Sequence, residues 1–223
     1  MNPLDCQAAY WDGAAANKTF THPLCLERLR AFVPPDGKIL DFGCGYGRTV
    51  AFLSASGYEN VVGVDISSAM IRRGRGLSAG LDLRHIKDHV LPFPDHSFAA
   101  CLLLAVLNCL PTDGGQQALI GELHRVLKPS GILYLSDYPL QPDAKNRQRY
   151  DRYKDRFGQY GVFQLTDGAV LRHHDIAWIH RLLDRFDIVG QETMDVLTMN
   201  GNRAVIFQII ARKRVQTPRR GSS

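Results

Sequence analysis

The chain has 223 residues, 45% of them hydrophobic, which is enough for one well-buried domain and short for two. No stretch approaches the roughly 20 apolar residues that a membrane-spanning helix needs, so we expect no membrane partner. The five cysteines are odd in number and show no CxxC spacing, which argues against a disulfide framework and against a zinc site. The first residues, MNPLDCQAAYWDG, lack the basic head and apolar core of a secretory signal, so we expect a cytoplasmic protein.

The formal net charge of +5 arises at the end of the chain. Five basic residues lie in the last dozen positions: Arg212, Lys213, Arg214, Arg219 and Arg220. The other 22 basic residues balance the 22 acidic ones, and a neutral body disfavours a nucleic-acid partner. We interpret residues 212–223 as a solvated basic tail, with a weak anchor to an anionic surface as the alternative.

The segment Lys38–Leu53, KILDFGCGYGRTVAFL, reads as a strand that turns through glycines into a helix. The apolar run at 39–42 fits a buried parallel strand, and the helical pattern begins at Arg48. The turn contains Gly43, Gly45 and Gly47. Glycine permits a tight turn and lets a ligand touch backbone that a Cβ would shield. A dinucleotide fingerprint would need a glycine at position 48, so the pattern here is DxGxGxG from Asp41.

This pattern resembles the first motif of the class I S-adenosylmethionine (SAM) methyltransferases, an acidic residue followed by GxGxG. The resemblance implies that the loop of Asp41, Gly43, Cys44 and Gly45 passes the methionine half of SAM. Cys44 is either a reactive thiol or a small residue that fills a tight turn, and we favour the second interpretation.

A second short strand, Val61–Asp65, ends in an acid 24 residues after Asp41. At about this distance a nucleotide-binding βαβ unit places an acid that accepts hydrogen bonds from ribose hydroxyls. The family resemblance implies that Asp65 binds both ribose hydroxyls and that Ile66 and Met70 line the adenine. Helix capping, the alternative role for this acid, belongs more naturally to the serines that follow it.

Residues 87–98, KDHVLPFPDHSF, follow a third predicted strand at 81–86. Many class I methyltransferases carry an acid a few residues before LPFPDxSFD. The resemblance therefore implies that Asp88 accepts a hydrogen bond from the adenine amine, with His89 beside it. The chain departs from the family pattern at 99–100, where two alanines stand.

The uninterrupted apolar run Leu102–Leu104 predicts the central strand. Open α/β sheets bind their ligands at the carboxyl edge, so we expect Leu104 beside the cofactor. A helix at 116–127 leads into LKPSGILYLSD at 127–137, which is similar to the helix, Lys-Pro-x-Gly turn and strand of the family. Residues 39–137 thus contain four family motifs in order, and this order is more specific than any one of them.

We interpret residues 1–37 as an N-terminal cap segment, with an amphipathic helix at 24–32. In many small-molecule methyltransferases a leading segment folds over SAM. The resemblance implies that Tyr10 and Trp11 lie near the sulfonium, where a cation attracts a π face. The alternative is that Trp11 and Phe20 only pin the segment to the core.

Residues 138–175 are polar, aromatic and basic, and lie where the family inserts substrate-binding structure. Four aromatic residues recur at helical intervals: Tyr150, Tyr153, Phe157 and Tyr160. They form either one wall of an acceptor pocket or a packing face toward the body, and we favour packing. Residues 158–172 predict a hairpin with Asp167 and Gly168 at its turn.

The predicted hairpin ends in Arg172, His173 and His174. Either histidine is a candidate general base, with Tyr138 next, and Arg172 is a candidate for holding an acidic substrate. A metal site is disfavoured, because adjacent residues on a strand point to opposite faces and no third ligand is evident. The alternative is a solvated loop that leads into a helix at 176–186.

The element order, closed by a hairpin at 188–196 and 203–211, predicts one α/β domain over 38–211. We expect a Rossmann-like seven-stranded sheet, mostly parallel with an antiparallel last strand, and helices on both faces. The resemblance implies a SAM-dependent methyltransferase that acts on oxygen, nitrogen or sulfur of a small-molecule acceptor, as a monomer or homodimer. The alternatives are a non-catalytic SAM-binding protein and a methyltransferase acting on RNA or protein, while Arg48 disfavours a nicotinamide dehydrogenase.

Overall fold

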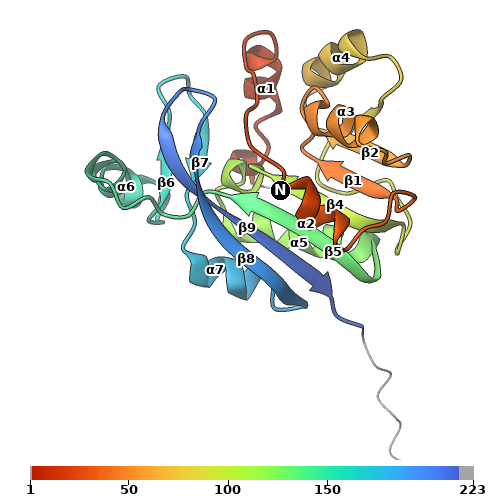
Figure 1. Ribbon diagram of the computed structural model, residues 1–223. Coiled ribbons are helices and arrows are strands. Elements are labelled where there is room, and N and C mark those ends of the chain that lie inside the picture. The colour runs from red at the N-terminus through yellow and green to blue at the C-terminus, as the bar shows by residue number, and fades with distance from the viewer. Residues whose placement is uncertain (1, 216–223) are drawn as a thin grey trace, which may run out of the picture.

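A seven-stranded sheet forms the centre of the computed structural model, which describes residues 2–215 (Figure 1). The strand order is β3-β2-β1-β4-β5-β9-β8. The strands are β1 (Ile39–Phe42), β2 (Val61–Asp65), β3 (Asp82–His85), β4 (Phe98–Leu104), β5 (Leu127–Asp137), β8 (Phe186–Leu197) and β9 (Arg203–Lys213). All residues of β1 are buried, as expected for a strand that lies inside a sheet covered on both faces.

The first five strands run parallel, and the last part of the sheet is antiparallel. Strand β9 lies between β5 and β8 and is antiparallel to both. The predicted Rossmann-like sheet with an antiparallel last strand is confirmed. Because the parallel strands share one carboxyl edge, the loops after β1, β2 and β4 meet there.

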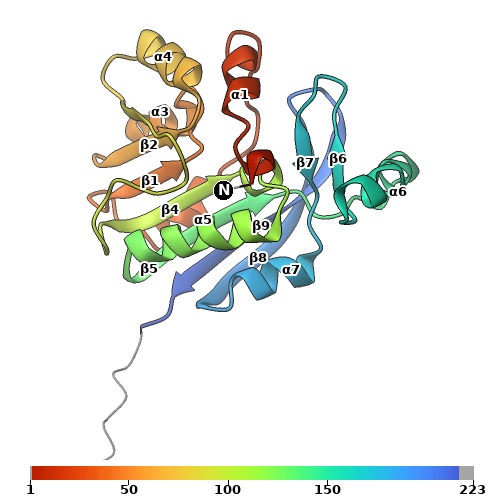
Figure 2. The same ribbon diagram turned by 180° about the vertical axis from the view of Figure 1, so that it is seen from behind.

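Helices cover both faces of the sheet. They are α1 (Ala8–Ala14), α2 (Leu26–Arg30), α3 (Arg48–Ala55), α4 (Ser68–Leu77), α5 (Asp113–Val126), α6 (Ala144–Phe157) and α7 (Ile176–Leu182), with 3-10 turns η1 (Pro3–Asp5) and η2 (Leu107–Cys109). Figure 2 shows α5 and α7 along one face, where Leu123 and Ile179 join one core cluster. On the other face, Leu29 of α2 and Leu53 of α3 join the second. None of the helices described is both long and apolar enough to cross a membrane.

The segment after β5 forms the predicted hairpin and a polar helix. Strands β6 (Val162–Gln164) and β7 (Val170–Arg172) pair antiparallel, and Gly168 takes a positive φ of 98° at their turn. In Figures 1 and 2 this hairpin lies between α6 and α1, beside the tip of the β8–β9 hairpin. Helix α7 ends at Leu182, so the helix predicted to reach residue 186 is shorter, because Phe186 already starts β8.

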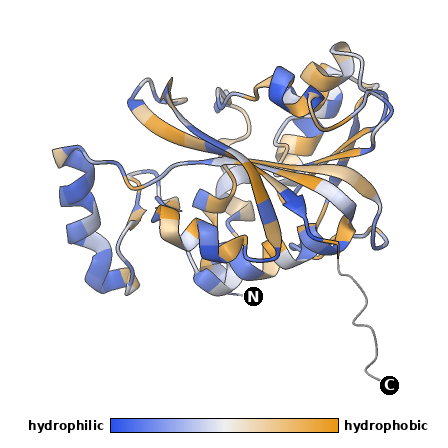
Figure 3. Cartoon of the chain, turned by 60° about the horizontal axis from the view of Figure 1, so that its bottom comes forward, coloured by the Kyte–Doolittle hydropathy of each residue, from blue (hydrophilic) through white to orange (hydrophobic). Residues whose placement is uncertain are grey.

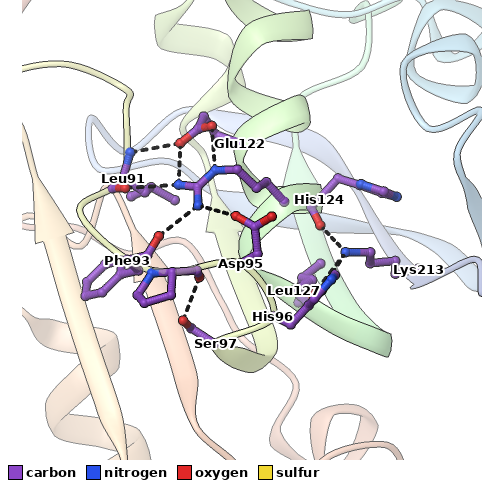
Figure 4. A network of polar contacts seen from close by, with 11 residues as sticks. Leu91, Phe93, Asp95, His96, Ser97, Glu122, His124, Leu127 and Lys213 are labelled. Atoms are coloured by element: carbon purple, nitrogen blue, oxygen red, sulfur yellow. Dashed lines mark hydrogen bonds and ion pairs between the residues drawn. The ribbon is translucent and has the colours of Figure 1, made fainter.

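Arg125 of α5 fastens the LPFPDHSF segment to that helix, and Figure 4 shows the surrounding Leu91, Phe93 and Asp95 of this segment. Arg125 donates hydrogen bonds to the carbonyl oxygens of Leu91 (3.0 Å) and Phe93 (2.8 Å). It also pairs with Asp95 and Glu122, each at 2.9 Å. These contacts hold the loop that precedes β4. The LPFPDHSF segment, which resembles the family motif, therefore has a structural role.

The last strand extends past the predicted boundary at residue 211. Lys213 is buried, and its Nζ donates to the carbonyl oxygens of His124 (2.6 Å) and Leu127 (2.8 Å), as Figure 4 shows. A cation here meets the carbonyl end of α5, which favours positive charge. Lys213 therefore belongs to the sheet, whereas Arg219 and Arg220 of the predicted tail lie outside the described residues.

Candidate functional site

A cavity of about 380 Å³ opens at the carboxyl edge of the parallel strands. Its lining comes from the strand ends, the N-terminal segment, the insert after β5 (residues 138–175) and the β8–β9 loop. Most of the residues that the sequence singled out line it: Tyr10, Trp11, Asp41, Gly43, Cys44, Asp65, Ile66, Met70, His89, Leu104, Tyr138 and His173. Segments that are far apart in sequence therefore share one site.

The glycine loop after β1 is folded so tightly that a side chain would not fit at Gly43. Gly43 has a φ of +72°, and a Cβ there would lie 2.5 Å from Cγ2 of Val106. The N–H groups of Gly43 and Cys44 both donate to the carbonyl oxygen of Val64, at 2.8 and 3.0 Å. The loop therefore presents backbone to the cavity. Cys44 is buried, and burial raises the pKa of its thiol, which fits a space-filling role better than a reactive one.

Replacing Gly43 by alanine should destabilise the protein more than replacing Gly57 by alanine. Both positions have positive φ, but a Cβ at Gly57 has nothing within 4 Å. The two variants thus share the left-handed backbone cost, and only Gly43→Ala adds a steric overlap, which costs about 1–3 kcal/mol. Urea unfolding would measure this difference. Equal midpoints and slopes for the two variants would contradict the close packing of the loop against Val106.

Asp65, at the end of β2, links the glycine loop to the start of α4. Its Oδ2 accepts from the N–H of Gly45 and its Oδ1 from the N–H of Ser67, both at 2.8 Å. Burial raises the pKa of Asp65, while these two hydrogen bonds oppose the rise. Capping of α4 belongs to Ser67, whose Oγ accepts from Met70 N–H at 3.1 Å, as the sequence predicted. Asp12 reinforces that cap by accepting from Ser67 Oγ at 2.7 Å.

Three polar atoms without hydrogen-bond partners in the described chain gather beside the loop: Asp41 Oδ2, Arg48 Nε and His22 Nδ1. All three residues line the cavity. Burial raises the pKa of Asp41 to about 7, and the neighbouring Arg48 charge opposes this rise. Burial lowers the pKa of His22 to about 4, so its ring is neutral at neutral pH. Unpartnered buried polar atoms cost free energy, so this cluster suits a ligand that carries a positive group for Asp41 and a negative group for Arg48.

The N-terminal segment, residues 2–22, crosses the cavity and is tied to the insert. The Gln7 side chain donates to the carbonyl oxygen of Val170 (2.8 Å) and accepts from its N–H (2.9 Å). The Tyr10 hydroxyl donates to Asp167 Oδ2 at 2.8 Å. These contacts place the N-terminal segment along one side of the cavity.

The aromatic rings of this segment both line the cavity and pin the segment. Trp11 meets Tyr10 and Phe20 edge-on, with ring centroids 5.0 and 6.1 Å away. Phe20 stacks on Tyr46 at 5.3 Å and occupies the space that a Cβ at Gly45 would need. Gly45 itself therefore lies outside the cavity lining.

Asp88 and His89 separate although they are adjacent in sequence. Asp88 is exposed outside the lining, and its Oδ1 accepts from Val90 N–H at 2.9 Å. This corrects the expectation that Asp88 faces the adenine, because its carboxylate closes a local turn instead. His89 is buried in the cavity wall, 5.8 Å from the Phe42 ring, with its Nε2 2.9 Å from the carbonyl oxygen of Asp5.

His174 and Arg172 point away from the cavity. His174 is fully buried, 6.3 Å from the Phe207 ring, and its Nε2 lies 3.8 Å from Asp137 Oδ1. No acceptor can reach it, which corrects the expectation that His174 is a candidate base. Arg172 pairs with Asp113 at 2.6 Å and lies outside the lining, so it does not hold a substrate.

His173 lines the cavity, and its hydrogen bond with Tyr150 determines which ring nitrogen carries the proton. Tyr150 Oη accepts from the N–H of Gln141 (3.0 Å), which leaves its own proton for Nδ1 of His173 (2.6 Å). Nδ1 is then an acceptor and Nε2 carries the ring proton. Burial and the Arg149 charge lower the pKa of His173 to about 3, so the ring is neutral. His173 thus offers the cavity an N–H donor, with the Tyr138 ring stacked on it at 5.5 Å.

The four aromatic residues at helical intervals pack the insert rather than line the cavity. Tyr150 is buried against Tyr160 (5.2 Å) and Phe163 (6.0 Å), and Tyr153 contacts Phe157 (5.9 Å). These contacts lie within residues 138–175, so the four aromatic residues hold the insert together. Phe163 of β6, which follows these residues in the chain, is the aromatic residue that lines the cavity here.

Several lining residues escaped the sequence analysis: Lys145, Arg149, Phe163 and Arg203. Lys145 and Arg149 stand four residues apart, which places them on one face of α6. This spacing was the only sign in the sequence that the two residues act together, and it shows only that they share a face of the helix. Which face turns to the cavity depends on how α6 packs on β6.

Comparisons with known proteins agree with this geometry. A family model described as a methyltransferase domain matches residues 40–135. The chain is 30% identical over 141 residues to 27-O-demethylrifamycin SV methyltransferase of Amycolatopsis mediterranei, covering 60% of this chain and 51% of that one. It is 36% identical over 129 residues to demethylmenaquinone methyltransferase of Clavibacter sepedonicus, covering 56% and 51%. The chain thus spans about half the length of these two relatives.

A solved SAM-dependent methyltransferase from Methanosarcina mazei shares the fold with a TM-score of 0.81 and 27% identity, covering 86% of this chain and 99% of that one. A methyltransferase of Bacillus subtilis named YodH is 31% identical over 175 residues, covering 75% of this chain and 66% of that one. Together with the sheet order, the glycine loop and the acid at the end of β2, these matches show that the chain belongs to the SAM-dependent methyltransferase family.

Proposed function

We propose that this protein transfers the methyl group of SAM to oxygen, nitrogen or sulfur of a small-molecule acceptor. The observation that carries the proposal is a single cavity that reaches from Gly43 and Asp65 to Tyr138 and His173. Such a cavity has room for a nucleoside at the strand ends and an acceptor against the insert. Two relatives have names that specify small molecules, a demethylrifamycin and demethylmenaquinone. The cytoplasmic location stays a prediction from the sequence.

The residues at the strand ends fit SAM. Asp65 offers carboxylate oxygens for ribose hydroxyls, and Gly43 leaves room for close approach to backbone. The unpartnered Asp41 Oδ2 suits the amino group of the methionine half, and Arg48 with His22 suits its carboxylate. When bound, SAM supplies an electrophilic methyl group for direct displacement by a nucleophile.

The chain's own residues mainly have to align the acceptor and exclude water. Alignment alone can lower a barrier by about 7–11 kcal/mol, so a dedicated base is optional. Tyr138 and Phe163 provide flat apolar walls, and the His173 N–H orients an acceptor oxygen or nitrogen. The N-terminal segment, tied through Gln7 and Tyr10, keeps water out.

The shape of the cavity also distinguishes this proposal from its rivals. The N-terminal segment, which Gln7 and Asp167 hold in place, narrows access for an RNA or a protein side chain. A non-catalytic SAM-binding protein would keep Asp41 and Asp65 but have no use for an open space beside His173. A small-molecule acceptor accounts for both features.

Calorimetric titration with SAM and with its product S-adenosylhomocysteine (SAH) tests the proposal first. We expect micromolar binding of both, because product and cofactor share the ribose and methionine contacts. A mass-spectrometric screen of phenols, amines, thiols and carboxylates with SAM would then identify the acceptor. Failure of both ligands to bind would contradict the cofactor site, and binding without methyl transfer to any acceptor would favour the non-catalytic alternative.

The affinity for SAM should fall with decreasing pH below about 7. Asp41 has a pKa raised to about 7, so it is protonated in acidic solution and has to release its proton to meet an ammonium group. The expected loss approaches about tenfold per pH unit between roughly pH 5.5 and 7. Calorimetry of the wild type and of Asp41→Asn would measure it. The variant should lack this pH dependence, and an unchanged dependence would remove Asp41 from the contact with the amino group.

A further inference from the structure

The outer end of the cavity is polar and basic. It is formed by one face of α6 and by the β8–β9 loop, which contribute Lys145, Asn146, Arg149, Asn200, Asn202 and Arg203. Figure 3 shows α6 as a largely hydrophilic helix at the edge of the molecule. The chain body as a whole is close to neutral, so a local gathering of cations at a cavity mouth calls for a physical reason.

The acidic residues nearby form no ion pair with these cations within residues 2–215, although the charge of Asp143 acts on Arg149. Lys145 and Arg203 are exposed and make no ion pair within residues 2–215. Asp143 is the acid among the described residues that line this end. Both of its oxygens are engaged by Asn146, through the N–H (3.0 Å) and through Nδ2 (2.6 Å), as the cap of α6.

Arg149 is the most constrained of the three cations. Its guanidinium carbon lies 3.5 Å from the centroid of the Phe163 ring, and the group donates to Asn146 Oδ1. Its Nε has no partner in the described part of the chain, and burial lowers the pKa of Arg149. A half-buried guanidinium without a carboxylate partner is costly, and a bound anion would offset that cost.

Ring contacts connect Arg149 to the place proposed for methyl transfer. Phe163 lies beneath the guanidinium, His173 is 5.0 Å from Phe163, and Tyr138 is 5.5 Å from His173. A molecule bound beside these rings would meet the guanidinium at one end and the His173 N–H at the other. The guanidinium is planar and binds carboxylate or phosphate through two parallel hydrogen bonds.

We propose that the acceptor is an aromatic acid, whose carboxylate or phosphate is held by Arg149 with Lys145 and Arg203 while its ring lies beside His173 and Tyr138. This inference rests on the proposed function, because it names the substrate class of that same site. It also assigns to α6 and the β8–β9 loop the anion-binding role that Arg172, paired with Asp113, does not fill.

Calorimetric titration with a matched set of compounds tests the proposal. The probes are 4-hydroxybenzoate, 4-hydroxyphenyl phosphate and the neutral 4-hydroxybenzamide, each with and without SAH. We expect the wild type to bind at least one anion at least tenfold more tightly than the amide. The carboxylate and phosphate titrations then distinguish the two kinds of anionic group. The preference should weaken with added salt, since it arises from charge.

Arg149→Gln should abolish the preference for the anion while leaving the affinity for SAH unchanged. Arg149→Lys should retain part of it, because a charge remains without the planar fork. Arg147→Gln is the matched control: it makes the same change of charge on the same helix, at an exposed residue outside the lining. Circular dichroism and thermal unfolding of each variant would establish that the fold is retained.

Equal affinities of the wild type for anions and amide would overturn the proposal, as would no detectable binding of either anion at millimolar concentration. A preference that persists in Arg149→Gln would also overturn it. Failure of SAH to bind would count against the proposed function instead, since the anion preference is measured in its absence as well. The two proposals therefore fail by different observations.

Discussion

Asp65→Ala should weaken SAM binding by about tenfold or more, since each hydrogen bond to a charged group contributes roughly 1.5–3 kcal/mol. The reason is twofold. The carboxylate is the proposed acceptor for the ribose hydroxyls, and it also accepts from the N–H groups of Gly45 and Ser67, which hold the loop and the start of α4. Its removal therefore takes away a ligand contact and loosens the backbone around it. Calorimetric titration with SAM measures the loss.

Asp88→Ala provides the control for this experiment. Asp88 is exposed outside the cavity, so its loss should leave the affinity for SAM unchanged. A second variant, Asp65→Asn, keeps the size of the side chain and isolates the charge. Wild-type affinity in Asp65→Ala would remove Asp65 from the binding site, and a large loss in Asp88→Ala would restore the adenine contact that the sequence suggested.

His173→Ala should lower the rate of methyl transfer by about tenfold to a hundredfold while leaving the affinity for SAM unchanged. The Nε2–H of His173 faces the acceptor end of the cavity, and its loss would leave an acceptor poorly aligned. The measurement is single-turnover kinetics with an acceptor from the screen, accompanied by SAM titration. A wild-type rate in His173→Ala would show that this ring takes no part in the reaction.

The pH profile separates an N–H donor from a general base. The pKa of His173 is lowered to about 3, so its ring should not titrate between about pH 5 and 8 and should add no acidic limb to kcat/KM there. His173→Gln, which retains an N–H donor, should recover part of the rate. Tyr150→Phe should lower the rate as well, because the hydroxyl proton that fixes the tautomer is lost. A limb near pH 6–7 that disappears in His173→Ala would instead support a general base.

The sequence by itself determined the elements and their order. The strand at 39–42, the glycine turn and the helix from Arg48 are encoded by neighbouring residues, through apolar periodicity and the need for positive φ at Gly43. A parallel sheet brings the carboxyl ends of its strands to one edge. The residues at the ends of β1, β2 and β4 must therefore lie near one another. For this reason Asp41, Asp65 and Leu104 could be assigned to one site in advance.

Tertiary structure decided the direction of side chains whose neighbours are remote in sequence. Asp88 and His89 are adjacent, yet only His89 faces the cavity, because Asp88 closes a turn with Val90. His173 and His174 also diverge, since successive residues of an extended segment point to opposite sides, and only the packing of the segment after β7 shows which side meets the cavity.

The acceptor end of the site depends on long-range packing almost entirely. Arg149 reaches it because α6 lies on β6 and sets the guanidinium over Phe163, a contact that no local pattern specifies. Tyr10 reaches it because its hydroxyl bonds Asp167, which lies 157 residues away in the chain. Local sequence sets periodicity, turns and caps, whereas the pairing of distant segments is decided by how the whole core packs.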